Sequence, residues 1–355
     1  MSRQLVFDGH NDLLARLYLA GGVTAANQFQ AGRPSGHLDA RKARIGGFGG
    51  GFFAIWVPST QRGTPQRRDA NEAMRAFHYD IPLSPMVPAD DALRAARIQM
   101  ETLQALQDQG SLTICTTADH IEQVMEAGDI AAFAHMEGAE AIDPDFAVLD
   151  EFHALGLRSL GPVWSRPTIY GEGVPFRFPG SPDIGGGLTN HGRRLVAKCN
   201  ALKMMIDLAH LNEAGFWDVA RLSDAPLVAT HSNAHTLCPH ARNLTDKQLD
   251  AIAESGGVVG LNFAAAFLRA DGRMRSDTPL SLMIEHLDHM IKRMGEDHVA
   301  LGSDFDGAVI PADIGSVAGL PVLVHAMEAH GYGHELIAKI CRGNWMRVIR
   351  LTQGL

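Results

Sequence analysis

Short apolar runs recur along the whole chain, and most are separated by segments with a helical pattern. The runs span residues 5–12, 52–57, 130–138, 157–163, 203–210, 225–231, 258–262 and 299–304. Continuous apolar runs of this length are typical of strands buried on both faces of a parallel sheet. Eight such strands alternating with helices predict an α/β fold, a (β/α)₈ TIM barrel. No repeat, low-complexity tract or linker divides the sequence, so we expect a single domain over residues 1–355.

The segments between the runs differ in pattern. Residues 90–109 have apolar side chains at helical spacing among polar ones, which predicts an amphipathic helix, and shorter helices are expected at 146–155 and 189–201. Residues 20–47 are rich in Gly, Ala and Gln, and residues 164–187 are rich in Pro and Gly. Both read as long loops, and long loops that follow barrel strands often build sites.

Composition restricts the class of partner. The 355 residues are 46% hydrophobic with a net charge of -9, which allows a large core and excludes a general affinity for nucleic acid or an anionic membrane. The four cysteines are widely scattered, so neither a disulfide framework nor a thiolate zinc site is expected. No secretory signal or membrane-spanning run is present. We expect a soluble, cytoplasmic protein with a small-molecule partner.

Polar residues close five of the apolar runs at their carboxyl ends. They are His10 and Asp12, Glu137, His210, His231 and Asp304. Singly, a histidine at such a place is usually structural, and an acid is often a helix cap. Together they are all metal-ligand types, and the carboxyl ends of barrel strands meet at one mouth, where the active sites of this fold lie. The pattern therefore predicts a metal site.

Five of these residues suit two cations. Glu137 is placed to bridge the ions, with His10 and Asp12 on one and His210 and His231 on the other. Because metal coordination lowers the pKa of water, such a pair can supply a hydroxide nucleophile at neutral pH. Asp304 then remains to accept the proton of the nucleophile and pass it to a leaving amine. These residues predict a metal-dependent hydrolase.

Six stretches resemble the renal, or membrane, dipeptidase family (peptidase family M19) of the amidohydrolase superfamily. They are Asp-Gly-His-Asn-Asp at 8–12, Glu-Gly at 137–138, Ile-Asp-Leu-Ala-His at 206–210, Thr-His-Ser-Asn-Ala at 230–234, Arg-Asn-Leu at 242–244 and Gly-Ser-Asp-Phe-Asp-Gly at 302–307. The resemblance implies a binuclear zinc dipeptidase with two Zn²⁺ per subunit, usually a homodimer, that tolerates a D-residue at the C-terminal position. It also implies that Glu137 is shared by both ions and that Asp304 transfers the proton.

The same resemblance gives Arg242 the role of binding the C-terminal carboxylate of the substrate. A guanidinium can grip a carboxylate with two hydrogen bonds, although a structural ion pair is the alternative reading of Arg242. Two positions depart from the family. Trp164 stands where a substrate-contacting histidine is usual, and Ala264 stands where some members have a tyrosine. His135 shares a face with Glu137, and we expect it to be structural.

Three functions follow from these features. The first is a metal-dependent dipeptidase that acts on dipeptides with a free carboxylate. The second, suggested by Trp164 and Ala264, is a related amidohydrolase that cleaves N-acyl amino acids or another small amide. The third is a metal-stabilised binding protein without turnover, against which the presence of Asp304 and five ligands argues.

Overall fold

A computed structural model of the chain describes residues 4–59 and 67–355. Within them, parallel strands pair in the order β1-β2-β5-β6-β8 and, in a second sheet, β9-β10-β11. Isolated parallel bridges join Asp207 to Val228 and Asn11 to Phe305, so each sheet edge meets the other. These eight strands therefore close into a ring, and the predicted (β/α)₈ barrel is confirmed.

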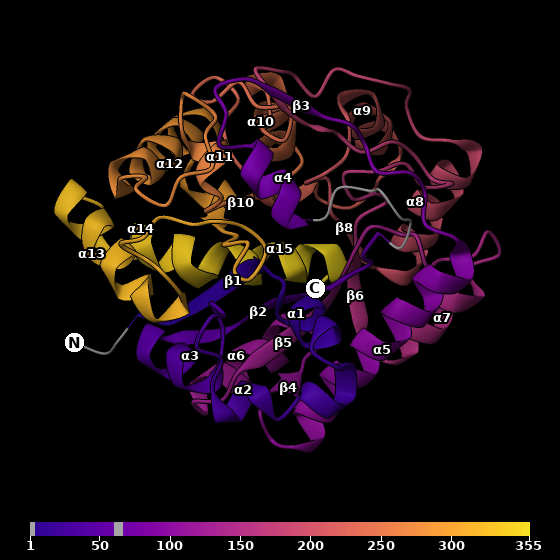
Figure 1. Cartoon of the computed structure of the whole chain (residues 1–355), viewed down its shortest axis with the longest axis horizontal. Coiled ribbons are helices and arrows are strands. Elements are labelled where there is room, and N and C mark those ends of the chain that lie inside the picture. Colours follow the sequence, from indigo (N-terminus) through magenta and orange to yellow (C-terminus); the bar gives the residue numbers. More distant parts are fainter. Residues whose placement is uncertain (1–3, 60–66) are drawn as a thin grey trace.

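The barrel strands coincide with the eight apolar runs. They are β1 (Val6–Asn11), β2 (Phe48–Trp56), β5 (Ala131–Glu137), β6 (Leu157–Leu160), β8 (Met205–Ile206), β9 (Val228–Ser232), β10 (Val258–Leu261) and β11 (Val299–Leu301). Helices lie around the strands in Figure 1. The longer ones are α1 (Leu13–Leu19), α5 (Ala89–Asp108), α6 (Ala118–Glu126), α7 (Ala147–Ala154), α8 (Asn190–Leu202), α9 (Glu213–Leu222), α10 (Asp246–Glu254), α12 (Leu280–Met294), α13 (Leu320–His330) and α15 (Asn344–Gln353). The helices expected at 90–109, 146–155 and 189–201 are thus present as α5, α7 and α8.

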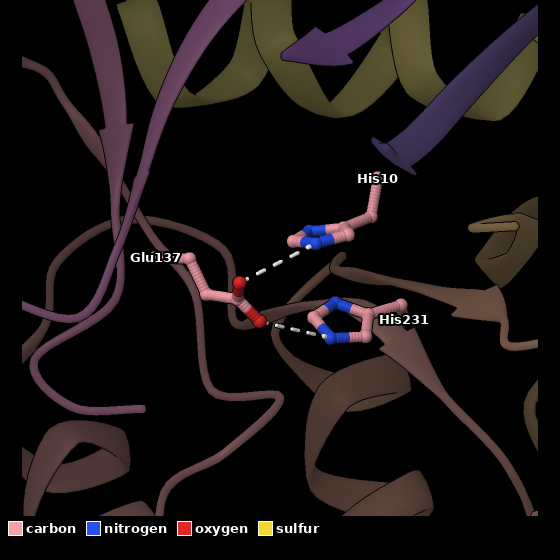
Figure 2. A group of neighbouring side chains, drawn as sticks. All are labelled: His10, Glu137 and His231. Carbon is pink, nitrogen blue, oxygen red and sulfur yellow. Dashed lines mark ion pairs between the residues drawn. The ribbon is translucent and has the colours of Figure 1, made fainter. Parts of the chain in front are cut away.

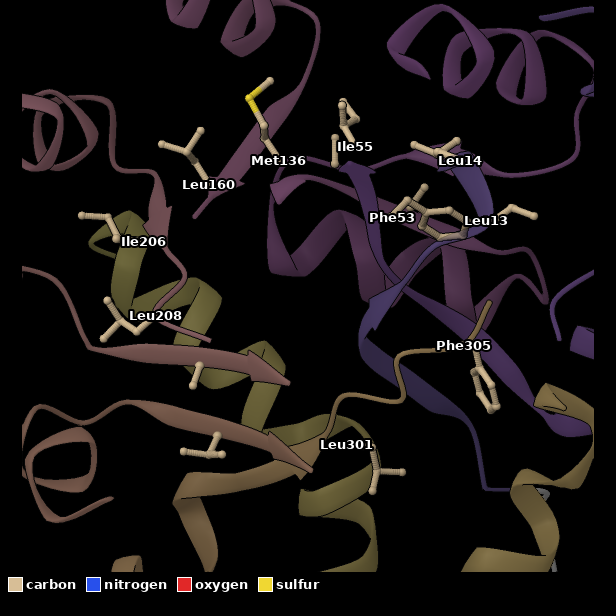
Figure 3. Close-up of a cluster of buried hydrophobic side chains, with 14 of the residues drawn as sticks. Leu13, Leu14, Phe53, Ile55, Met136, Leu160, Ile206, Leu208, Leu301 and Phe305 are labelled. Atoms are coloured by element: carbon tan, nitrogen blue, oxygen red, sulfur yellow. The ribbon is translucent and has the colours of Figure 1, made fainter. Parts of the chain in front are cut away.

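Alternate residues of a strand face the helices and the barrel interior. In β5, Ala134 and Met136 belong to the large apolar cluster between strands and helices, whereas Phe133 belongs to the interior cluster. Figure 3 shows part of the large cluster, with side chains of β2, β5, β6, β8 and β11 beside those of α1. This alternation leaves His135 and Glu137 on the face of β5 that Phe133 shares, which is the barrel interior.

The amino-terminal end of the barrel is filled by large apolar side chains and closed by α15. Phe52 contacts Phe7, Phe133 and Trp345 of α15, and all four are at most 1% exposed. The indole Nε1 of Trp345 donates to the carbonyl of Leu301 at 2.9 Å. The polar residues of β5, His135 and Glu137, lie toward the opposite, carboxyl end.

Three segments differ from the expectation. Strand β2 begins at Phe48, inside the glycine-rich stretch. Gly50 lies so close to β5 that a Cβ there would be 2.2 Å from the carbonyl oxygen of Ala131, so this position of the strand requires glycine. Residues 20–47 contain a 3₁₀ helix (Gly22–Ala25), α2 (Gln28–Ala31) and α3 (Ala40–Gly46), so reading the whole stretch as a loop was wrong.

The third difference lies in residues 164–187, which contain the short strand β7 (Phe176–Phe178). It pairs with β3 (Tyr79–Ile81) in an antiparallel ribbon outside the barrel sheets. The remaining elements are β4 (Thr113–Ile114), α4 (Arg67–Ala73), α11 (Ala265–Leu268), α14 (His334–Ala338), a π-helical turn (Lys339–Gly343) and short 3₁₀ turns at Glu296–His298 and Val317–Gly319. Across the described residues, no helix is long and apolar enough to cross a membrane.

Candidate metal centre

The carboxyl ends of the strands bring all six predicted polar residues to the mouth of the barrel, and each is at most 6% exposed. His10 lies in β1, Glu137 ends β5 and His231 lies in β9. The other three, Asp12, His210 and Asp304, follow β1, β8 and β11 within a few residues. We call His10, Asp12, Glu137, His210 and His231 the metal-ligand cluster.

Glu137 lies at the centre of the cluster, and its two oxygens face different histidines. Oε2 is 3.6 Å from Nε2 of His10, whereas Oε1 is 2.9 Å from Nε2 of His210 and 3.5 Å from Nε2 of His231. Figure 2 shows the carboxylate beside the imidazoles of His10 and His231, with one oxygen directed toward each. One carboxylate thus contacts both halves of the cluster, as a bridging ligand must.

His10 provides the test of whether these residues fit a metal ion. It is fully buried, yet neither ring nitrogen has a hydrogen-bond partner among the residues that the structure describes. Its Nε2 lies 3.6 Å from Glu137 and 3.7 Å from Asp12. Zinc binds nitrogen and oxygen at about 2.0–2.2 Å, so two ligands of one tetrahedral ion lie about 3.4 Å apart. The spacing is too long for hydrogen bonds and fits ligands that share a cation.

The charge of the cluster also favours a cation. Burial lowers the pKa of His10, but the carboxylates of Glu137, Asp12 and Asp304 outweigh burial and raise the pKa to about 9 in the metal-free protein. Two sets of donor atoms lie within 4.8 Å of one another, His10 with Glu137 and His231, and His10 with Asp12 and Asp304. The mouth therefore concentrates negative charge around donors that suit a divalent metal.

His231 is oriented by a chain of hydrogen bonds from neighbouring strands. Its Nδ1 lies 2.8 Å from Oγ1 of Thr230, and that hydroxyl donates to Oδ2 of Asp207 at 2.7 Å. Burial raises the pKa of Asp207, but the contacts with His135 and Thr230 outweigh burial, so the pKa lies below its usual value and the carboxylate is charged. Because the Thr230 proton goes to Asp207, Nδ1 of His231 is the donor to Thr230, and the lone pair of Nε2 faces the cluster.

His210 and His135 have comparable partners. Nδ1 of His210 lies 2.9 Å from Oγ of Ser165, and its Nε2 lies 3.2 Å from Nε2 of His231. His135 contacts Ser159 through Nδ1 at 3.0 Å and lies 3.4 Å from Asp207. Asp207, Thr230 and Ser165 had no predicted role. Asp207 and Thr230 stand within three residues of a predicted ligand in the sequence, whereas Ser165 follows Trp164 and is far from both histidines in the sequence.

Asp304 occupies strained backbone at the mouth. Its φ is 59°, in the left-handed region, and its amide donates to the carbonyl of His10 at 3.1 Å. Nδ2 of Asn262 donates to its Oδ2 at 3.2 Å. The side chain is thereby turned toward the same space as His10 and Asp12.

Arg242 lies against the backbone of the two segments that carry His210 and His231. It is 2% exposed, and its guanidinium donates to the backbone carbonyls of Ala209 and, at 3.1 Å, of His231. Burial lowers its pKa to about 10 against the opposing effect of Asp304 and Glu137. Its Nε has no hydrogen-bond partner in residues 4–59 and 67–355.

Trp164 lines the cavity that contains Glu137, His210 and Asp304. Its ring centroid is 5.8 Å from that of His210 and 5.3 Å from that of Trp56. Ala264, the other departure from the family, is fully buried in an apolar cluster beside this cavity.

A barrel with these residues at the carboxyl ends of its strands defines a class, the metal-dependent hydrolases. The sequence profile of the membrane dipeptidase family (peptidase family M19) matches residues 1–355, so the chain belongs to this family and is a metal-dependent dipeptidase. This enzyme class excludes the hypothesis of a binding protein without turnover.

Individual relatives are similar to this chain over most of its length, and two of them are solved metallopeptidases. A metallopeptidase from Rhodobacter sphaeroides, solved with a phosphinate mimic of the dipeptide L-Ala-D-Ala, is 52% identical with a TM-score of 0.94, over 98% of this chain and 99% of that one. The solved metallopeptidase dipeptidase AC of family M19 is 52% identical with a TM-score of 0.95, over 99% of each chain. An uncharacterized protein in the pqqA 5' region of Klebsiella pneumoniae is 53% identical over 241 residues, which is 68% of this chain and 89% of that protein.

Proposed function

We propose that this protein is a binuclear zinc dipeptidase that hydrolyses dipeptides with a free C-terminal carboxylate and tolerates a D-residue there. The proposal rests on the position of Glu137, whose two oxygens face His10 on one side and His210 and His231 on the other. In it, His10, Asp12 and Glu137 hold one ion, and Glu137, His210 and His231 hold the other. The L-Ala-D-Ala mimic bound by the Rhodobacter sphaeroides relative supports the substrate class.

Each residue then has a defined task. Two bound divalent ions would polarise the scissile carbonyl and lower the pKa of the attacking water. Asp304 accepts the proton from that water and returns it to the departing amine nitrogen, a role that suits a carboxylate beside the cluster. Thr230 and Ser165 hold the Nδ1 atoms of the two histidines so that their Nε2 atoms face the cluster.

Arg242 is proposed to recognise the C-terminal carboxylate. Its buried guanidinium provides a positive charge beside the cluster, and Nε retains an unused N–H donor. The hydrogen bonds to Ala209 and His231 give Arg242 a structural role as well. A homodimer, a cytoplasmic location and a single domain over residues 1–355 stay predictions.

Side-by-side assays test the function. We expect the metal-replete protein to hydrolyse Ala-Ala and its L,D form with a kcat/KM well above that for N-acetyl-alanine. Trp164 favours the second candidate, an amidohydrolase for N-acyl amino acids, because indole offers one N–H and no titratable group beside His210. Faster cleavage of N-acetyl-alanine than of any dipeptide would select that candidate.

A further inference from the structure

The cavity that contains the metal-ligand cluster continues into an apolar chamber under the β3–β7 ribbon. Its walls there come from segments far apart in the sequence. The large apolar side chains among them are Met74, Ile81, Leu83, Phe176, Phe267 and Met274, and the uncharged polar residues Asn71 and Ser84 lie beside them. The described part of the chain therefore places a hydrophobic surface next to the reacting groups, in a space open to a substrate side chain.

Aromatic rings form one continuous wall of this chamber. The ring of Phe176 lies 5.7 Å from that of Trp164 at 66° and stacks on Phe267 at 6.2 Å and 7°. Trp164 in turn lies beside His210. The wall thus leads from a predicted metal ligand to Phe267, without a charged side chain between these rings.

Trp164 is held from behind by a buried ion pair. The guanidinium of Arg166 lies 4.7 Å from the ring of Trp164 and 5.8 Å from that of Trp56, and Nη2 donates to the carbonyl of Val57 at 2.7 Å. Nε of Arg166 is 3.2 Å from Oε1 of Glu140, and both side chains are at most 2% exposed. A wall fixed in this way is formed before the substrate binds, which reduces the entropy lost on binding.

The charges around the cavity oppose an acidic side chain. Among the described residues that line it, the ionisable groups are Glu137, His210 and Asp304, all at the metal end, and no lysine or arginine is present. An acidic side chain in the chamber would lose water without gaining a counterion from these described lining residues, whereas an apolar one would gain from burial.

From these observations we infer that the chamber is a side-chain subsite that selects dipeptides with an apolar residue, and that Phe176 and Phe267 are specificity-determining residues. This inference rests on the proposed function, because it takes the cluster as the place where the peptide bond is cleaved.

The test measures kcat/KM on the zinc-replete protein for Ala-Ala and for dipeptides in which either alanine is replaced by Leu or by Asp. We expect Leu to exceed Asp by about tenfold or more at one of the two positions. Equal values for Leu and Asp at both positions, with Ala-Ala hydrolysed, would overturn the subsite and leave the proposed function standing. Hydrolysis of no dipeptide at all would contradict both.

A pair of variants examines the wall itself. Phe176 is half-buried on a short strand of the ribbon, so a lysine can be introduced there without entering the barrel core. Phe176→Lys should raise the ratio of kcat/KM for the Asp dipeptide to that for the Leu dipeptide by about tenfold, whereas Phe176→Leu should keep the apolar preference. Thermal unfolding verifies that both variants fold. An unchanged ratio in folded Phe176→Lys would show that this wall does not select the side chain.

Discussion

The two ends of the barrel are built from the same eight strands but in opposite ways. At the amino-terminal end, Phe7, Phe52, Phe133 and Trp345 fill the interior, and the polar atom of Trp345 has its hydrogen bond. At the carboxyl end, carboxylates and imidazoles are buried together, and the two ring nitrogens of His10 have no hydrogen bond within the described residues. One end is arranged to stabilise the fold, and the other is arranged to bind.

This difference has an energetic consequence. Burying several carboxylates close together is unfavourable because their charges repel and lose water, so the mouth lowers stability in the absence of a cation. Packed aromatic side chains at the other end compensate for this cost. Substitutions at the mouth should therefore change chemistry more than stability, and substitutions at the amino-terminal end should do the reverse.

The largest effect on chemistry is expected from Asp304→Asn. Asparagine has nearly the same shape but cannot accept the proton, so kcat should fall by about 10²–10⁴-fold while both metals stay bound. Steady-state kinetics with metal analysis measures this change. The matched control is Asp313→Asn at an exposed site, which should leave kcat unaltered. A near-native kcat in metal-loaded Asp304→Asn would show that this residue is not the proton carrier.

Trp345→Ala tests the opposite end. Removing a fully buried indole that touches Phe52 should lower the free energy of unfolding by about 3–5 kcal/mol, with little change in kcat of the folded enzyme. Denaturant unfolding and kinetics give the two quantities. Trp217→Ala, at a half-buried tryptophan on α9, is the control and should cost less. A lower kcat with an unchanged free energy of unfolding in Trp345→Ala would contradict the assignment of this end to stability.

Arg242→Lys separates recognition of the substrate from support of the strands. The loss of a charge-assisted contact should weaken transition-state binding of free dipeptides by about 1.5–3 kcal/mol, seen as a lower kcat/KM. The kcat/KM for their C-terminal amides should stay unchanged. Values of kcat/KM for the free dipeptide and its amide, measured in parallel, distinguish substrate recognition from a structural role of Arg242. Equal loss on the two would assign Arg242 only its structural hydrogen bonds to Ala209 and His231.

Thr230→Val is the smallest change at the mouth, since it removes one hydroxyl and keeps the shape. Without the hydrogen bond to Thr230, Nδ1 of His231 loses its orienting partner, and zinc affinity should fall by about 10–100-fold. Competition with a chelator measures this affinity, and Thr230→Ser should restore it. Unaltered zinc affinity in Thr230→Val would show that Thr230 and Asp207 do not orient His231 for metal binding.

The sequence was informative where side-chain pattern and strand position coincide. Apolar runs with polar ends located the eight strands and the six residues at the mouth, because the barrel brings carboxyl ends together. The start of β2 was missed because glycines have no side chains to form a pattern. The short helices in residues 20–47 were missed because tertiary packing, as of Phe29 and Ala43, stabilises such helices more than local propensity does.

Other features depend on contacts between distant segments. The β3–β7 ribbon pairs Tyr79 with Phe178, almost a hundred residues later, and neither strand is longer than three residues. The link between Asp207 and Thr230 joins two different strand ends, so its geometry cannot be read from the sequence alone. Such pairings become visible only when the chain is folded.

Zinc titration of the metal-free protein tests the central claim most directly, because the claim is that Glu137 holds two ions at once. Dipeptidase activity and bound zinc should rise together and reach a plateau at two equivalents per chain. Replacing Glu137 by Gln should weaken both equivalents, whereas His10→Ala should mainly weaken one. Full activity at a single equivalent, with no second ion bound in excess zinc, would contradict the account.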